Sequence, residues 1–530
     1  MQPESHKNDP ILQLVPLDNL STLQMAFRLD VFGQFTPIFQ FVREPTRLDA
    51  IDWEKYPKMA IWRENGTLIS IGDDESFTNR KKLSFTLEKV GKHSLLCEIY
   101  GNFDDAAMAE TAAWFWSLQH PEGGSLFINH AGREMQPHCV FDYSILQPEQ
   151  LARILDSNPM RHLHLQTGNG LQNNPLCSHR DHKGTAFVDA LKQRDSRFGS
   201  LRINCAPDMM PFSRDDLQQL LQLENVFEKL TLNSVEEDLV LLPLSAKVRV
   251  LKYDLDGYGI RGADLDSIDI AARDLDLRFD FQCNYNWVEV LTSFFNRVAS
   301  LGHFEKLRLS VGHSVDSICF EQTIPIVQAL KRAVGSNPKL MCLDLSDIQF
   351  LFDWPEHFAE IFQSLEVHNE LRTLVLSSYP PTYYDEEPDY QAYYSILERL
   401  LFRNRNITVV NESGKVCSNG TSIDRLYAMH RFYHGSRSRV KEEPSLLRPL
   451  LVTTALRESA SNNLQLTCVL LSHNVDILCE LVDNADFEQI AGPQSTVMDV
   501  ASVPTLDDGE ICSKRKSELH PSHAAKKALT

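Results

Sequence analysis

The sequence lacks the long apolar runs, the signal pattern and the cysteine pairs that mark membrane and secreted proteins. No run of about 18 consecutive apolar residues occurs. The opening residues, MQPESHKNDP, show no basic-then-apolar signal pattern. The 11 cysteines are scattered singly without a CxxC pair, which is typical of reduced thiols. We therefore expect a cytoplasmic or nuclear protein without a transmembrane segment.

Basic residues are also scarce, with 52 Lys and Arg against 72 Asp and Glu and a net charge of −20. A nucleic-acid-binding surface needs clustered Lys and Arg, so we expect no nucleic-acid partner. The P-loop, the dinucleotide-binding glycine pattern and the HExxH zinc motif are absent as well. We therefore expect a protein that is not an enzyme and has neither a cofactor nor a bound metal.

What the sequence does contain is a recurring leucine phrase. It is clearest where it reads L-x-x-L-x-L, at Leu340, Leu343 and Leu345 and again at Leu371, Leu374 and Leu376. Degraded copies, most of them preceded by an amphipathic helical pattern, lie at Leu163 and Leu165; Phe198, Leu201 and Ile203; Phe227, Leu230 and Leu232; Val248, Val250 and Leu251; Leu275 and Leu277; Phe304, Leu307 and Leu309; and Asn404, Ile407 and Val409. The phrase predicts repeating strand-plus-helix units.

This pattern, over residues 145–412, resembles the leucine-rich-repeat superfamily in its ribonuclease-inhibitor-like form with irregular repeats. The resemblance implies an α/β solenoid with a parallel sheet and outer helices. One feature departs from the family, which has Asn or Cys three positions after the last Leu of each phrase. Those positions are Gly168, Ala206, Val235, Gly312, Ile348 and Tyr379 here. We therefore expect an irregular solenoid.

In such a solenoid the residues between the leucines point out of the concave face of the sheet, where a protein partner would bind. These residues are polar, and cations are prominent among them. The candidate partner-binding residues are His162, His164, Arg202, Asn204, Lys229, Thr231, Lys306, Arg308, Asp344 and Thr373.

Before the repeats, residues 21–122 predict a small antiparallel β-rich domain with one helix. Asn65-Gly66 predicts a hairpin with a type I′ turn, because Asn and Gly accept the positive φ that this turn requires. A helix that contains Trp116 follows, capped by Asp104 or Asp105. The order of elements resembles the pleckstrin-homology superfold. A cluster of cations between Arg80 and Lys92 would then face a lipid headgroup or simply solvent.

After the repeats, residues 420–486 predict a helical cap, because an open solenoid end exposes apolar core. Residues 1–20 and 487–530 are expected to be disordered. Lys514–Lys516 and Lys526–Lys527 in the tail resemble a bipartite nuclear-import signal, although basic tails are common.

Four segments carry residues capable of chemistry. His162, His164, Cys177, His179 and His182 are metal-capable, but their spacing fits no known zinc site. The segment 254–259 resembles the start of a calcium-binding loop, but its first Gly is at the fourth position, whereas an EF-hand loop needs Gly at its sixth position. The segment 312–316 lacks the final Gly of a nucleophile elbow. A tyrosine-rich acidic loop, 378–394, is either a recognition loop or a solvated one.

Three functional hypotheses follow. The first is a non-enzymatic scaffold that binds a protein partner through the concave face. The second is a substrate-recruiting adaptor of a ubiquitin-ligase-type complex, against which stands the lack of an F-box-like motif before the repeats. The third is a metal-dependent hydrolase with a site near His179 and His182.

Overall fold

The computed structural model shows two compact units, residues 1–435 and 436–530. The residues that it describes are 11–27, 37–53, 58–72, 82–88, 94–101, 105–120, 124–130, 146–167, 185–194, 197–204, 210, 212–233, 235–257, 260–281, 286–312, 320–352, 354–381, 390–431, 452–457 and 463–474. The tail with its predicted import signal lies outside the described residues, as do Cys177, His179, His182 and most of the tyrosine-rich loop.

The first unit is α/β, and its described strands form one sheet of 16 strands. In chain order these strands are β1 (Leu12–Leu14), β2 (Ile38–Phe41), β3 (Met59–Trp62), β4 (Leu68–Ile71), β5 (Lys82–Glu88), β6 (Ser94–Tyr100), β7 (Ser125–His130), β8 (His162–Thr167), β9 (Phe198–Asn204), β10 (Phe227–Leu232), β11 (Val250–Asp256), β12 (Asp274–Asp280), β13 (Lys306–Gly312), β14 (Cys342–Asp344), β15 (Thr373–Leu376) and β16 (Thr408–Asn411).

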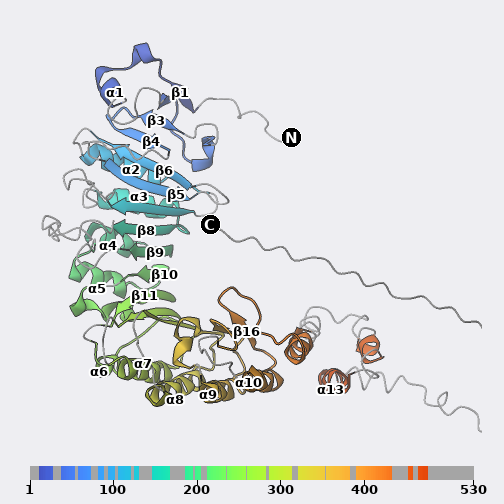
Figure 1. Ribbon diagram of the computed structural model, residues 1–530. Coiled ribbons are helices and arrows are strands. Elements are labelled where there is room, and N and C mark those ends of the chain that lie inside the picture. Colours follow the sequence, from blue (N-terminus) through green and yellow to red (C-terminus); the bar gives the residue numbers. More distant parts are fainter. Residues whose placement is uncertain are drawn as a thin grey trace, which may run out of the picture. The chain divides into compact units, whose positions relative to one another are not determined.

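From β7 to β16 the strands follow one another in the sheet in chain order, and every neighbouring pair is parallel. The first strands are mainly antiparallel, although β2 and β3 pair in parallel. Strand β7 joins the two parts, since it pairs antiparallel with β5 and parallel with β8 (Figure 1). The sheet therefore passes without a break through the domain boundary that the sequence predicted near residue 122.

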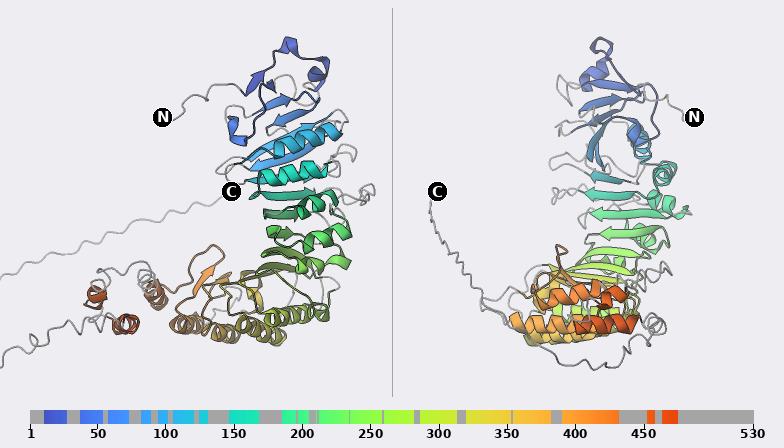
Figure 2. Two further views of the ribbon diagram at one scale, coloured as in Figure 1. Left: turned by 180° about the vertical axis from the view of Figure 1, so that it is seen from behind. Right: turned by 90° about the vertical axis from the view of Figure 1, so that its right-hand side faces the viewer.

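The helices that connect the parallel strands lie on one face of this sheet, as Figure 2 shows. Their bounds are α2 (Asp105–Trp116), α3 (Pro148–Ser157), α4 (Thr185–Lys192), α5 (Arg214–Gln222), α6 (Gly262–Leu265), α7 (Trp287–Leu301), α8 (Phe320–Ser336), α9 (Pro355–Leu365) and α10 (Tyr390–Arg403). Three 3-10 helices also follow strands: η8 (Glu237–Leu239), η9 (Leu242–Ser245) and η10 (Ser346–Leu351). This repetition is compatible with an α/β solenoid.

The leucine phrase builds the core between the sheet and these helices. Its middle positions are in register from strand to strand and buried: Leu126, Leu163, Leu201, Leu230, Leu251, Leu275, Leu307, Leu343, Leu374 and Val409. Helices such as α7 contribute apolar residues three and four apart, including Val290, Phe294 and Val298. Each unit thus buries its apolar face against its neighbours.

In β11 the sequence assigned the wrong residue to the core. Val250 faces away from the helices, and the phrase there is Val248, Leu251 and Tyr253, all buried. The Tyr253 hydroxyl donates a 2.7 Å hydrogen bond to the carbonyl oxygen of Val240, which makes an aromatic residue acceptable in a leucine position. In β12 the first position is Ala272, which is also buried.

Buried amide and imidazole groups hold the turns where helices end and strands begin. Asn337 accepts a hydrogen bond from the N–H of Phe304 (2.9 Å) and donates to the carbonyl oxygens of Val298 and Ala333 (3.1 and 2.7 Å). The Nε2 of His368 donates to the carbonyl oxygen of Asn337 (2.9 Å). Asn158 and Asn404 are buried at equivalent turns. These buried side chains form what we name the amide ladder, at turns that follow the helices, whereas the Asn or Cys of the leucine-rich-repeat family follows the strand.

The amino-terminal end of the sheet is covered on both faces. Ile38, Ala60, Leu68 and Tyr100 form a small second core on the face away from the helices, where Val15 and Leu20 pack against it. Residues 15–20, which include the 3-10 helix η1 (Leu17–Asn19) just before α1 (Thr22–Phe27), thus close an apolar surface that the sequence did not predict. Beside it, the buried Lys82 and Glu98 form an ion pair of 2.7 Å.

The predicted hairpin at Asn65-Gly66 is present, because β3 and β4 pair antiparallel around it. Only Gly66 has a positive φ there, +83°, so the turn is not type I′. Asn65 instead donates hydrogen bonds to the carbonyl oxygen of Ala107 (3.2 Å) and the hydroxyl of Thr111 (3.0 Å) in α2. The asparagine therefore ties the hairpin to the helix.

At the carboxyl end of the sheet, a helix that includes residues 422–431 packs on β16. Tyr427 is buried there, and its hydroxyl accepts a hydrogen bond from the N–H of Val409 (3.2 Å). The described part of the second unit contains a short helical segment at 452–457 and α13 (Leu464–His473). No helix among the described residues is long and apolar enough to cross a membrane.

Candidate partner-binding surface

The face of the sheet opposite the connecting helices, which we name the open face, carries two aligned rows of side chains across ten strands. The first row is Ser125, His162, Ser200, Lys229, Val250, Asp274, Lys306, Cys342, Thr373 and Thr408. The second row is Phe127, His164, Arg202, Thr231, Lys252, Asp276, Arg308, Asp344, Val375 and Val410. Both rows arise because alternate residues of a strand point to opposite faces.

The structure brings the predicted partner-binding residues together on this face. Nine of the ten lie in the two rows, and the tenth, Asn204, follows on β9 beside Asn233, whose amide donates a hydrogen bond to it. Their accessibility differs. His162, Arg202, Lys229, Lys306 and Arg308 are exposed, whereas His164, Asn204, Asp344 and Thr373 are half-buried. Thr231 is only 6% exposed and is closer to packing than to contact.

In the central part of the open face, cations and carboxylates alternate and pair. Lys252 lies 3.0 Å from Asp276, and Lys306 lies 3.3 Å from Asp274. Arg308 contacts both Asp344 (3.5 Å) and Asp347 (3.1 Å). Lys306 and Arg308 of β13, which the sequence singled out, are therefore neutralised, whereas the exposed Arg278 of β12 has no ion-pair partner within 4 Å among the residues that the structure describes. Exposed pairs of this kind contribute little to stability, so their main effect is on the charge that a partner meets.

The amino-terminal part of the face is different. His162, His164, Arg202 and Lys229, on β8 to β10, form what we name the basic patch. Among the residues that the structure describes, neither Arg202 nor Lys229 has an ion-pair partner within 4 Å. The Nδ1 of His162 lies 2.5 Å from the hydroxyl oxygen of Ser200, so this ring is held in place.

His164 reports the electrostatics of the patch. Partial burial, together with the charges of Arg202, His162 and Lys229, lowers the pKa of His164 to about 4. Its ring centroid lies 4.0 Å from that of Phe127, with 37° between the ring planes. At neutral pH the imidazole is therefore uncharged and forms, with Phe127, an aromatic floor beside two permanent cations.

The sequence analysis missed the acidic half of the face. Asp254, Asp274 and Asp276 lie on β11 and β12, whose strands the sequence marked only by weak copies of the phrase, and the aspartates were not assigned to this face. The signal was present as alternation of aspartate with apolar residues in DLDLRFD. Burial raises the pKa of Asp254, although Lys252 and the next strand's Arg278 oppose that shift. Asp254 thus lies between the basic patch and the ion pairs that Asp276 and Asp274 form with Lys252 and Lys306.

The candidate chemical sites gain no support from the described residues. No group of three or more His, Cys, Asp or Glu side chains comes together there in a geometry that would hold a metal ion. His162 and His164 share a strand, and the other three metal-capable residues lie outside the described part of the chain. Asp254 and Asp256 belong to β11, and Gly312 ends β13.

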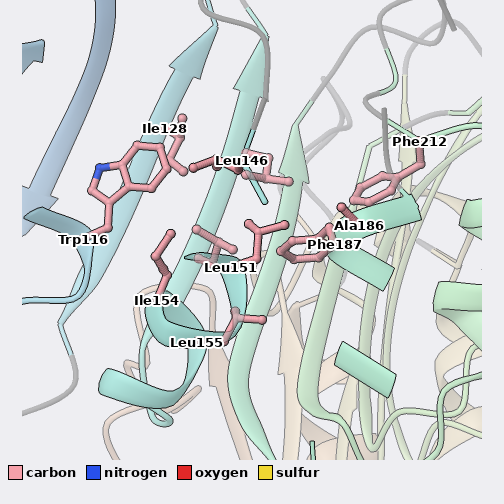
Figure 3. Close-up of a pocket in the computed structure, with 11 residues that line it drawn as sticks. Trp116, Ile128, Leu146, Leu151, Ile154, Leu155, Ala186, Phe187 and Phe212 are labelled. Atoms are coloured by element: carbon pink, nitrogen blue, oxygen red, sulfur yellow. The ribbon is translucent and has the colours of Figure 1, made fainter. Parts of the chain in front are cut away.

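One small cavity lies in the core, between α2, α3, α4 and strands β7 and β8. It encloses about 50 Å³ and is lined mainly by aliphatic and aromatic side chains, among them Leu146, Leu151 and Phe187 (Figure 3). The indole nitrogen of Trp116 is at the end of the ring away from Leu146 and Phe212. With that size and a mainly apolar lining, the cavity is a packing gap of the apolar core.

Nothing in the comparisons extends this geometry to a known protein. A scan against protein-family models, a search of curated proteins and a search of solved structures each found no match to the chain.

Proposed function

We propose that this chain is a non-enzymatic interaction scaffold, a leucine-rich-repeat-like solenoid that binds a protein partner through its open face. The observation that carries the proposal is the pair of aligned rows across ten strands. A surface of this kind presents polar side chains on a rigid support over a long distance, which suits a protein better than a small molecule. The connecting helices leave this face to solvent (Figure 2).

The chemistry of the face also favours recognition over catalysis. Most charged groups of its centre pair with one another, as Lys252 does with Asp276. A catalytic site instead gathers a few groups with perturbed pKa values in a concave pocket. The cavity described above is apolar and belongs to the core.

The test compares two variants with the same change in charge. The open-face variant combines Arg202→Glu and Arg278→Glu, both exposed on the open face. The control combines Lys339→Glu and Arg403→Glu, which are exposed at a turn and at the end of α10. Each tagged chain is expressed in cells and its neighbours are identified by proximity labelling and quantitative mass spectrometry.

We expect the open-face variant to lose a defined set of neighbours that the control retains. Circular dichroism spectra that match the wild type would show that both variants are folded. If every neighbour of the wild type is retained by the open-face variant, the open face is not the binding surface and the proposal fails.

A further inference from the structure

The two parts of the open face differ in how their charges are satisfied, and this difference points to the chemistry of the partner. In the centre, the acid that neutralises each of three cations is supplied by the chain itself, as Asp274 is for Lys306. In the basic patch, among the described residues, no carboxylate lies within 4 Å of Arg202 or Lys229. The patch therefore offers two exposed cations that a partner is free to pair with.

We propose that the basic patch binds the side-chain carboxylates of an acidic peptide segment in a partner protein. This inference rests on the proposed function and adds the class of partner. Arg202 and Lys229 lie on neighbouring strands with an offset of two residues, because Arg202 is opposite Thr231 and Lys229 precedes Thr231 by two residues. Two carboxylates spaced along an extended segment can each meet one of these cations.

The surroundings of the two cations suit a peptide. Phe127 and His164, whose ring centroids lie 4.0 Å apart with the planes tilted by 37°, give an aromatic contact on one side. On the other side, Asn204 and Asn233 are half-buried amides that can bond to a peptide backbone. An aromatic contact beside charged and amide groups is the composition of protein recognition surfaces.

The charge of the whole chain sharpens the argument. With a net charge of −20, the protein repels an acidic segment over most of its surface. Burial lowers the pKa of His164, and the nearby charges of Arg202 and Lys229 lower it further, in keeping with two cations placed close to this ring. An acidic segment is therefore attracted at the patch, while the net negative charge of the chain disfavours its binding elsewhere.

The test uses the full chain and fluorescence anisotropy with a labelled peptide of about 12 residues in which Glu alternates with Gly, long enough to cross the patch in extended form. A peptide with Gln in place of Glu is the ligand control. The variant Arg202→Glu with Lys229→Glu is compared with Arg202→Gln with Lys229→Gln, which removes the charge without reversing it. Lys339→Glu with Arg403→Glu is again the matched control.

We expect saturable binding of the Glu peptide, no binding of the Gln peptide, and a loss of affinity of about tenfold or more in both patch variants. The control variant should stay within about twofold of the wild type, and binding should weaken as sodium chloride rises from about 50 to 500 mM.

Three outcomes would overturn the inference: no saturable binding of the Glu peptide up to about 1 mM, equal binding by wild type and patch variants, or equal binding of both peptides. Tighter binding of a single-stranded oligouridylate with the same dependence on Arg202 and Lys229 would also overturn it, because the ligand would then be a phosphate backbone.

Failure here is distinguishable from failure of the proposed function. If the cellular neighbours depend on the open face while the Glu peptide does not bind, the scaffold function stands and only the acidic chemistry is wrong.

Discussion

The turn amides give a sharp test of what holds the repeats together. Replacing Asn337 by Ala removes a side chain that is 1% exposed and makes three hydrogen bonds. The N–H of Phe304 then loses its acceptor inside the core. The carbonyl oxygen of Val298 keeps a partner, since it also accepts from the N–H of Gly302 (3.2 Å). The loss therefore falls mainly on one buried donor.

The magnitude follows from that distinction. A buried donor without a partner costs about 1–3 kcal/mol, and each bond that is replaceable contributes about 0.5–1.5 kcal/mol. Allowing for partial relaxation, we expect Asn337→Ala to reduce the free energy of unfolding by about 2–4 kcal/mol. The matched control is Asn296→Ala in α7, where the amide oxygen accepts from Arg332 at an exposed site. Alanine also favours a helix, so that variant should stay within about 0.5 kcal/mol of the wild type.

Both variants are measured by urea unfolding followed by far-ultraviolet circular dichroism. Because a long repeat array can unfold in parts, hydrogen–deuterium exchange of the peptide covering residues 298–312 locates the effect. We expect faster exchange at that turn in Asn337→Ala alone. A variant as stable as the control, with unchanged exchange, would refute the view that the amide ladder holds the repeats in register.

Three further predictions concern packing, backbone and pH. Leu343→Ala, at a fully buried core position, should reduce the free energy of unfolding by about 2–5 kcal/mol. Val375→Ala, on the open face, should reduce it by clearly less. Equal urea midpoints for the two variants would contradict the assignment of the two sheet faces. Gly302→Ala should destabilise the fold by about 1 kcal/mol or more, because φ is +64° and the new Cβ would lie 2.9 Å from a carbonyl oxygen. Gly335→Ala in α8, where the new Cβ meets open space, should stabilise the fold by up to about 1 kcal/mol. A thermal unfolding experiment that ranks the two variants in the other order would refute both expectations. The imidazole of His164 should titrate near pH 4 by nuclear magnetic resonance. Because the pKa of His164 is lower in the folded than in the unfolded chain, its contribution to stability is lost as pH falls from about 6.5 to 4. His164→Gln should therefore reduce the loss of urea stability over this range, and a pH profile equal to that of the wild type would count against the low pKa.

The regular part of the core was predictable because it depends on spacing alone. Leucines at L-x-x-L-x-L positions, such as Leu343 and Leu374, must all face one side of a strand, and the helical stretches between them must cover that side. From this the parallel order of β13 to β16 and most of the open face followed. The candidate residues were found in the same way, as the positions between the leucines.

What the spacing did not reveal depends on contacts between residues far apart in the chain. Tyr253 takes a leucine position because a distant carbonyl group accepts its hydroxyl. This substitution and the small Ala272 weakened the phrase in β11 and β12, so their aspartates were not assigned to the open face. Likewise, no local sequence pattern predicts that Val15 and Leu20 cover a second core. The ion pair between Lys306 and Asp274 of the preceding repeat is not predicted by local sequence either.

The even spacing of the open-face rows has a consequence for the shape of any extended partner. Neighbouring strands lie about 4.8 Å apart, so the first row measures about 43 Å from β7 to β16 along the sheet. A partner in the polyproline II form advances about 3.1 Å per residue with three residues per turn, so one turn of about 9.3 Å nearly matches the spacing of two strands. Side chains three residues apart in such a partner point to the same side. A partner that crosses the face in this form would therefore show a sequence period of three residues, with each repeat in contact with every second strand.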